Sequence, residues 1–265
     1  MVTSRQNPLV KLVRRLRLRK HRDESGLFIC EGARVVDELL KSGWPIQHVV
    51  VTPRTDRAFA ERARARGAEV TLIEDELADY LAEADSSQGV LAVAQRKHLP
   101  LPARPALLVI ADRIADPGNL GAIIRTAGAF GCAGVVLLGT CADPFGPKTV
   151  RASAGSLFHL SVIQCSADEE LLTLTASLDV RIAVAVARDG VAPWEADLRD
   201  AFAFVFGHET RGVSPSLVAA ADLRLTIPLH PRAESLNVAT AAAVLLAEAA
   251  RQRTKSTEPR SEPRT

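Results

Sequence analysis

Apolar segments of strand length alternate with helix-like segments along this chain. Leu107 to Ala111, Val135 to Leu138 and Phe202 to Phe206 are uninterrupted apolar runs, and helix-like stretches lie between such runs. Strands that are apolar on both faces and alternate with helices form a mostly parallel sheet that helices cover on both sides. The sequence therefore predicts an α/β fold with a mostly parallel C-terminal sheet.

A proline-rich stretch separates two regions that both show this alternation. His98 to Pro105 holds three prolines in eight residues, which favours a stiff and extended linker. The region before it, from Gly26 to about Arg96, predicts a smaller α/β domain. We therefore expect a basic segment and small domain in 1–97, a linker in 98–105, a second domain in 106–252, and a disordered polar tail in 253–265.

The composition is that of a folded, soluble protein. Of the 265 residues, 47% are hydrophobic and 24% are charged, unlike the polar signature of disordered chains. The longest uncharged stretch, residues 126–142, has 17 residues and four glycines, whereas a membrane-spanning helix needs about 20 apolar residues. The four cysteines form no C-x-x-C pair, which argues against structural zinc and disulfides and indicates a reducing, cytoplasmic location.

The first 22 residues are strongly basic. They hold eight basic residues and no acidic one, so the rest of the chain carries −6 to give the net charge of +2. Apolar residues recur at helical spacing and predict an amphipathic helix from Pro8 to His21. Three interpretations stay open: a helix packed on its own domain, a contact with nucleic-acid phosphates, or a membrane-surface or transit segment. The candidate phosphate contacts are Arg14, Arg15, Arg17 and Arg19.

Three loops that follow predicted strands carry unusual residues. Residues 116–121 read Asp-Pro-Gly-Asn-Leu-Gly before a helix that contains Arg125, residues 207–212 read Gly-His-Glu-Thr-Arg-Gly, and residues 235–237 read Ser-Leu-Asn. In open parallel sheets, ligands bind beyond the carboxyl ends of the strands. Each loop alone also has a structural explanation, which is a tight turn, a turn-capping carboxylate or a helix N-cap.

Two classes of enzyme are disfavoured by missing motifs. A nucleotide-dependent oxidoreductase would need a G-x-G-x-x-G turn with an acidic residue about 20 positions later, and the sequence has no such turn. His208 lies near Glu209, but no G-x-S-x-G elbow accompanies them, which argues against a hydrolase.

Taken together, the three loops resemble the signature motifs of the SpoU/TrmH family of RNA ribose 2′-O-methyltransferases, within the SPOUT superfamily. The matching residues are Asn119 with Arg125, Gly207-x-Glu209-x-x-Gly212, and Ile227-Pro228 with Ser235-Leu236-Asn237. Two further segments resemble the family, Lys148-x-x-Arg151-Ala152-Ser153-x-Gly155-Ser156 and Gln88-Gly89-Val90-Leu91-Ala92. The resemblance covers roughly residues 20 to 250.

This resemblance implies a fold, a methyl donor and an assembly. The expected catalytic domain is an α/β sheet with a deep trefoil knot, a rare exception to the rule that chains do not thread loops. A small α/β RNA-binding domain precedes it. The implied donor is S-adenosylmethionine, the implied assembly is a homodimer in which the first motif reaches toward the partner's active site, and no metal is required. The residues that would contact the donor are Gly207, Ile227, Leu236 and, after the strand Arg181 to Val186, Ala187.

The resemblance also assigns roles in the chemistry. Arg125 would meet the ribose hydroxyl and either stabilise the developing alkoxide or act as general base, although a guanidinium pKa above about 12 makes the first role physically easier. Hydrogen bonds from Asn119, Ser235 and Asn237 would hold the arginine or the ribose, and Glu209 would orient this network. Lys148 and Arg151 would add phosphate contacts.

The size of the N-terminal domain favours large-subunit (23S) ribosomal RNA as the substrate within this family. Two alternatives stay open: a tRNA 2′-O-methyltransferase, and a non-catalytic RNA-binding protein with the same fold. A pure binder would have no reason to keep the five polar motif residues together, and all five are present. The sequence does not distinguish a role in ribosome maturation from one in antibiotic resistance.

Overall fold

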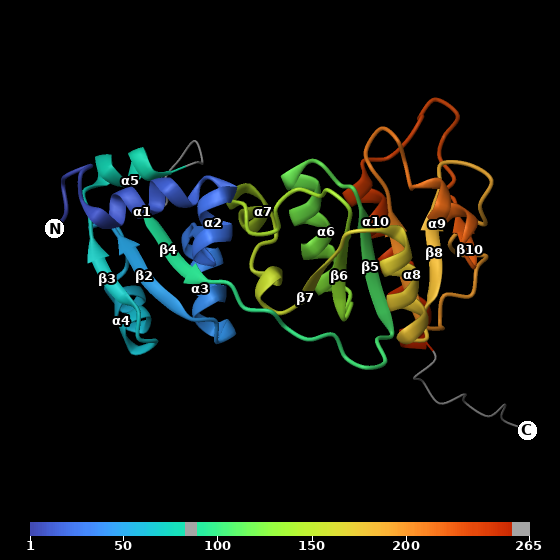
Figure 1. Cartoon of the computed structure of the whole chain (residues 1–265), viewed down its shortest axis with the longest axis horizontal. Helices are drawn as coiled ribbons and strands as arrows, with labels where there is room; N and C mark the ends of the chain where they lie inside the picture. The colour runs from blue at the N-terminus through green and yellow to red at the C-terminus, as the bar shows by residue number, and fades with distance from the viewer. Residues whose placement is uncertain (83–88, 256–265) are drawn as a thin grey trace, which may run out of the picture. The chain divides into compact units, whose positions relative to one another are not determined.

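The computed structural model of the chain describes residues 1–82 and 89–255, and Figure 1 labels its helices and strands. It divides into two compact units, and one division between them, after Leu99, falls within the predicted linker. The first unit holds Met1–Leu99 together with Asp116–Arg125 and Ala142–His159, and the second holds the rest of the described chain. Two segments from beyond the proline-rich stretch therefore pack with the N-terminal region. Gln88 and residues 256–265 of the predicted tail lie outside the described residues.

The first unit contains a four-stranded mixed sheet. Its order is β1 (Leu27–Glu31), β4 (Val90–Gln95), β2 (Ile46–Val51) and β3 (Glu69–Leu72). Strand β4 runs antiparallel to both β1 and β2, whereas β2 and β3 are parallel. The helices of the N-terminal region are α1 (Pro8–Leu16), α2 (Arg19–Ser25), α3 (Ala33–Ser42), α4 (Arg57–Ala65) and α5 (Asp75–Leu81).

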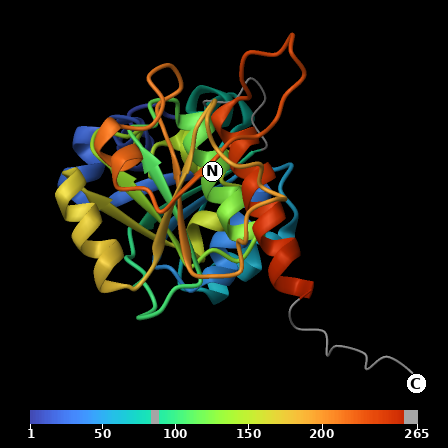
Figure 2. The same ribbon diagram turned by 90° about the vertical axis from the view of Figure 1, so that its right-hand side faces the viewer.

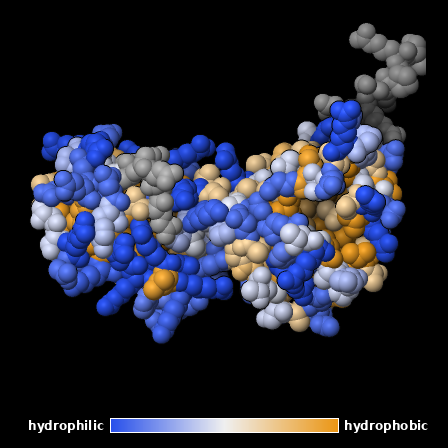
Figure 3. All heavy atoms as spheres, turned by 90° about the horizontal axis from the view of Figure 1, so that it is seen from above, coloured by the Kyte–Doolittle hydropathy of each residue, from blue (hydrophilic) through white to orange (hydrophobic). Residues whose placement is uncertain are grey.

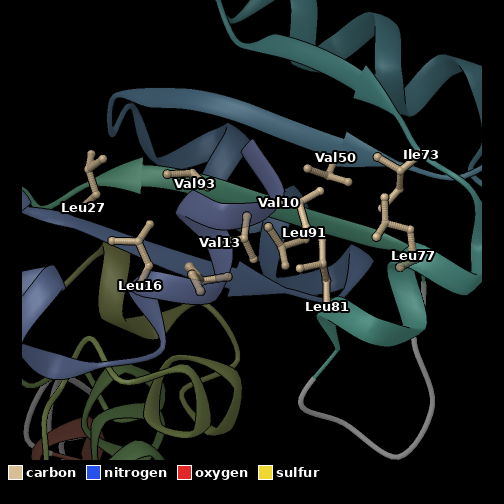
Figure 4. Packing of buried hydrophobic residues seen from close by; sticks show 12 residues of the cluster. Val10, Val13, Leu16, Leu27, Val50, Ile73, Leu77, Leu81, Leu91 and Val93 are labelled. Carbon is tan, nitrogen blue, oxygen red and sulfur yellow. The ribbon is translucent and has the colours of Figure 1, made fainter. Parts of the chain in front are cut away.

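The predicted basic helix is two helices. Leu18 has an extended backbone (φ −87°, ψ 129°), so α1 ends before it and α2 starts after it. The apolar side of α1 is buried through Val10, Val13 and Leu16, which pack with residues of the sheet and of α5 (Figure 4). The interpretation of a helix packed on its own domain is therefore confirmed for this face.

The second unit contains a six-stranded sheet in which every pair of neighbours is parallel. Its order is β10 (Leu223–Leu225), β8 (Arg181–Ala185), β9 (Phe202–Phe206), β5 (Leu107–Asp112), β6 (Gly134–Leu138) and β7 (Ser161–Cys165). The central strands β5 and β9 are buried over their whole length, which is why their sequences are uninterrupted apolar runs. The predicted parallel sheet and the smaller α/β domain before it are confirmed.

The strand order reverses beside β5. The chain runs outward from β5 through β6 to β7, then crosses to β8 and places β9 between β8 and β5. Ligands of parallel sheets bind at such a switch point, beyond the carboxyl ends of the strands. The loops after β5, β8, β9 and β10 are therefore the ones that can build a site. The trefoil knot stays a prediction.

The remaining helices connect and flank these strands. They are α6 (Pro117–Ala129), α7 (Pro147–Ala152), the 3₁₀ helix η1 (Ser156–Phe158), α8 (Asp168–Ser177), α9 (Pro215–Ala219) and α10 (Val238–Lys255). The last helix includes Arg253 to Lys255, which were predicted to belong to the disordered tail. Among the described residues, none of the helices is long and apolar enough to cross a membrane.

Candidate active site

A pocket of about 310 Å³ lies at the carboxyl ends of β8, β9 and β10, beside the start of α10. Every residue that lines it belongs to the second unit. Figure 2, which faces this unit, shows the orange-red loop between β10 and α10 standing away from the sheet. Seven of the nine predicted catalytic and donor-binding residues line the pocket: Ala187, Gly207, Glu209, Ile227, Ser235, Leu236 and Asn237.

The turn after β9 can form only because its first residue is glycine. A Cβ atom on Gly207 would lie 2.2 Å from the carbonyl carbon of Gly212 and from the nitrogen of Val213. The Gly212 amide donates to the carbonyl oxygen of His208 at 2.9 Å and closes the turn. Residues 207–213 therefore fold back on themselves and present backbone, with few side chains, to the pocket.

Glu209 links this turn to the loop after β5. Its Oε2 accepts a hydrogen bond from the backbone N–H of Ala115 at 3.4 Å. Nδ1 of the neighbouring His208 accepts the backbone N–H of Thr210 at 3.1 Å, so the imidazole stabilises the turn by a local hydrogen bond. The carboxylate of the second motif therefore joins two of the loops that the sequence analysis selected.

Asp112, a buried carboxylate that was not predicted from the sequence, fixes the far end of the loop after β9. Asp112, only 1% exposed at the end of β5, accepts the backbone N–H of Ser214 at 2.7 Å and pairs with Arg113. Arg113 also contacts Asp168 at 3.0 Å, and Ser216 donates to the same carboxylate. The signal in the sequence is an acidic residue at the end of a wholly apolar strand.

These contacts shift the pKa values of Asp168 and Arg113. The hydroxyl of Ser216 and the guanidinium of Arg113 lower the pKa of Asp168, and hydrogen bonds to Asp168 and Asp112 raise the pKa of Arg113. Arg113 adopts a left-handed backbone (φ 57°), which is uncommon for a residue other than glycine. These ion pairs and hydrogen bonds clamp the loop that leads from the pocket to α9.

The third motif forms both the rim of the pocket and the start of α10. The Asn237 side chain accepts the backbone N–H groups of Ala239 at 2.9 Å and Thr240 at 3.4 Å, which is the geometry of a helix N-cap. The structural explanation for Asn237 is therefore confirmed, and the same residue lines the pocket. Ser235 is exposed at the rim.

Asn119 and Arg125 lie on α6 in the first unit and are absent from the pocket lining. Asp116 caps this helix, since its Oδ1 accepts the backbone N–H of Asn119 at 2.9 Å. Lys148 of α7 holds the other carboxylate oxygen at 2.9 Å and lowers the pKa of Asp116. Arg125 is exposed on α6. The first motif therefore belongs to a different compact unit from the second and third motifs.

Most candidate phosphate contacts already bind groups of their own unit. Arg17 donates to the carbonyl oxygens of Leu81 and Ala82 at 2.6 and 2.8 Å and caps the end of α5. The remaining pairs are Arg14 stacked over Tyr80, Arg19 with Asp23, Lys148 with Asp116 and Arg151 with Glu31, while Arg15 is exposed. On the face drawn in Figure 3, hydrophilic side chains dominate the surface of the first unit, and apolar side chains gather on the second.

Comparison with known proteins identifies the family. The SpoU rRNA Methylase family matches residues 106–247, which is more than half of the chain. The chain belongs to the SpoU rRNA methylase family. The MRM3-like substrate binding domain matches residues 7–92, ahead of the methylase region.

Relatives of this SpoU methylase resemble it along nearly their whole length. The 23S rRNA (guanosine(2553)-2′-O)-methyltransferase RlmP of Bacillus subtilis is 33% identical over 92% of this chain and 97% of its own. A 23S rRNA (uridine(2479)-2′-O)-methyltransferase of Streptomyces viridochromogenes is 31% identical over 89% of this chain and 86% of its own. The crystal structure of an AdoMet-bound rRNA methyltransferase from Sinorhizobium meliloti superposes with a TM-score of 0.84 at 33% identity, over 94% of this chain and 97% of that one.

Proposed function

We propose that this SpoU methylase transfers the methyl group of S-adenosylmethionine to a ribose 2′-hydroxyl of 23S ribosomal RNA. One observation carries the proposal: in a chain of this family, residues of the second and third motifs, far apart in sequence, line one pocket at the carboxyl ends of β8, β9 and β10. The relatives named for 23S rRNA match both regions of the chain, which favours ribosomal RNA over transfer RNA.

The pocket suits the donor in size and lining. Its 310 Å³ falls within the range of about 300–1,000 Å³ for small-molecule sites, and apolar walls from Phe206, Leu225 and Leu245 meet a few polar groups. S-adenosylmethionine, when bound, supplies a methyl group on a positively charged sulfur. An oxygen nucleophile can attack the methyl carbon, and the sulfur leaves as a neutral thioether. Backbone at Gly207, Ile227 and Leu236 would hold it, and Ala187 would close one side.

Arg125 is proposed to act on the ribose oxygen. A ribose hydroxyl is a weak nucleophile at neutral pH, so the reaction needs close positioning and stabilisation of the negative charge that develops on the oxygen. A guanidinium keeps its proton with a pKa above about 12, so it stabilises that charge more readily than it removes a proton. The hydroxyl proton then leaves to a phosphate or to water.

The polar motif residues are proposed to position this chemistry. Glu209 already joins the turn after β9 to the loop after β5, and it would orient the polar network. Ser235 and Asn237 on the pocket rim would hold the ribose, and Asn119 would support it or the arginine. Within 1–82 and 89–255, no group of three or more His, Cys, Asp or Glu side chains is placed to hold a metal ion, and a metal-independent reaction stays a prediction.

The assembly is proposed to be a homodimer with a shared active site. Supporting this, Asn119 and Arg125 are not among the residues that line the donor pocket of their own chain. Mixing Arg125→Ala protein with Gly207→Ala protein, at a donor concentration too low for either variant to be active alone, tests the proposal. Restored transfer in the mixture indicates sites built from two chains, whereas no restoration, or a mass of 28.4 kDa in solution, contradicts it.

The test of the function itself is transfer of labelled methyl from S-adenosylmethionine to total bacterial RNA that lacks the modification, separated into ribosomal and transfer fractions. Label in 23S rRNA is the expected result. Label in transfer RNA would overturn the substrate and favour the tRNA enzyme. If no fraction takes label and calorimetry shows no donor binding, the chain is an RNA-binding protein on this fold.

A further inference from the structure

The segment Ala142–His159, which we call the α7 segment, follows β6 in the chain but packs with the N-terminal domain. The short helix α7 and the 3₁₀ helix η1 lie within it. The same compact unit contains Asp116–Arg125, which carries Asn119 and Arg125. The RNA-binding domain and the first motif are therefore parts of one body, and the α7 segment connects them.

An aromatic cluster joins the α7 segment to the N-terminal domain. Phe28 and Trp44 of that domain pack against Phe145 and Phe158, with ring centroids between 5.3 and 6.3 Å apart. All four side chains are buried, and Nε1 of Trp44 donates to the carbonyl oxygen of Phe158 at 3.0 Å. Such rings bury large apolar areas and favour specific mutual orientations.

Polar contacts fix the same junction. Arg22, 4% exposed, donates twice to one carboxylate oxygen of Asp143, at 2.8 and 2.6 Å. A Cβ atom on Gly155 would lie 2.6 Å from Cβ of Glu38, and the φ of Gly155 is +96°. The backbone of the α7 segment thus touches α3 so closely that a methyl group cannot enter.

The α7 segment also packs closely against α6, the helix that carries the first motif. A Cβ atom on Gly121 would lie 2.5 Å from Cβ of Ala152 and 2.6 Å from the carbonyl oxygen of Thr149. Lys148 holds the carboxylate of Asp116, which in turn accepts the backbone N–H of Asn119. The start of α6 is therefore held by α7 through both backbone packing and an ion pair.

We propose that the α7 segment fixes Asn119 and Arg125 relative to the RNA-binding domain, with Gly121 and Gly155 as positioning residues. This inference rests on the proposed function, since it assigns Arg125 to the ribose. RNA held by the N-terminal domain is then presented to Arg125 in a set register, while the donor pocket is built entirely from the other unit. A misplacement of about 1 Å at a reacting group can cost roughly 100-fold in rate, so this junction controls the chemical step.

Three glycine-to-alanine variants test the proposal. In Gly121→Ala and Gly155→Ala, the single-turnover rate at saturating 23S rRNA should fall roughly 10- to 100-fold. Binding of RNA and of S-adenosylmethionine, measured separately, should stay as in the wild type. Gly67→Ala is the control for Gly155→Ala, because its φ of +80° also disfavours a side chain while no atom lies within 4 Å of the added methyl. Gly155→Ala protein that loses only RNA affinity, with a normal rate at saturation, would overturn the proposal.

A measurement without catalysis separates this inference from the proposed function. Gly155→Ala, and the milder Trp44→Phe, should speed hydrogen–deuterium exchange of the amides in 119–125 and leave those of β8 and β9 unchanged. Unchanged exchange in 119–125 would contradict the coupling even if the enzyme is active. An inactive wild-type protein whose 119–125 amides respond as expected would overturn the proposed function alone.

Discussion

The donor pocket and the basic N-terminal region differ in what holds their functional residues. Apolar side chains and loop residues line the pocket, and the tight turn after β9 exists because residue 207 has no side chain. In the N-terminal region, long cationic side chains bind carbonyl oxygens, an aromatic ring and carboxylates of the same unit.

This difference shows which kinds of prediction from sequence are reliable. Parallel strands bring their carboxyl ends to one edge, so loop residues identified by position come together once the topology is right. The number of positive charges in a segment does not predict which group each charged side chain binds. The predictions below test whether the two regions are separable in function, from the largest expected effect to the smallest.

Arg125→Ala should abolish most transfer while donor binding stays intact. Loss of one group that stabilises developing charge typically costs about 100- to 1,000-fold in rate. Single-turnover kinetics and calorimetry with S-adenosylmethionine measure the two effects, with Arg199→Ala, an exposed arginine paired to Asp197, as control. Arg125→Lys should keep part of the rate. Full activity in Arg125→Ala would remove this residue from the mechanism.

Arg22→Met should destabilise the first unit strongly. Removal of one partner from a buried ion pair costs about 3–5 kcal/mol, and the Arg22 and Asp143 side chains are only 5% and 11% exposed. The control is Arg19→Ala at the exposed pair with Asp23, where about 0.2–1 kcal/mol is expected. Urea unfolding compares them. Equal losses in the two variants would show that Arg22 has no special structural role.

Gly207→Ala should weaken donor binding and spare RNA binding. The added methyl overlaps the backbone of residues 212 and 213, and overpacking of this kind costs about 1–3 kcal/mol. That corresponds to roughly 5- to 150-fold weaker binding in calorimetry. Gly131→Ala in the same unit, where nothing lies within 4 Å, is the control. Normal donor affinity would place the donor away from this turn.

Arg15→Ala should change RNA binding without affecting the fold. Arg15 is exposed on α1, and loss of one phosphate contact lowers the slope of log affinity against log salt by about 1. Arg17→Ala should instead reduce stability, because Arg17 caps the end of α5. Filter binding from low to high salt, together with thermal unfolding, tests both. An unchanged slope in Arg15→Ala would move the phosphate contacts elsewhere.

Asp168→Asn should show a pH-dependent loss of stability. Ser216 and Arg113 depress the pKa of Asp168 below its usual 3.8, so its contribution is present above pH 3.8 and is lost as pH falls through the lower folded-state value. The difference from wild type in urea unfolding should thus be constant at neutral pH and shrink below 3.8. A difference that grows on acidification would contradict the ion pair.

Much of the fold could be predicted because local pattern and topology agree. The apolar runs of β5 and β9 predict central strands, and both strands are buried along their whole length. The break at Leu18 could not be predicted, because no glycine or proline marks it. The pairing of Arg22 with Asp143 spans 121 positions, and no local pattern indicates it.

The same reasoning explains the outcome for the site. The predicted donor residues all line one pocket, since strand ends place them there. Asp112 was missed because one acid after a strand resembles an ordinary turn residue. The attachment of the α7 segment to the N-terminal domain was missed as well, because this segment follows the linker in the sequence.

The most direct test of the central claim is alkaline hydrolysis of 23S rRNA labelled by this enzyme. Alkali cleaves RNA through a free 2′-hydroxyl, so a ribose methyl group protects the adjoining linkage. The account predicts that the label stays in alkali-resistant dinucleotides and that Arg125→Ala protein produces none. Label released in mononucleotides would place the methyl group on a base and contradict the account.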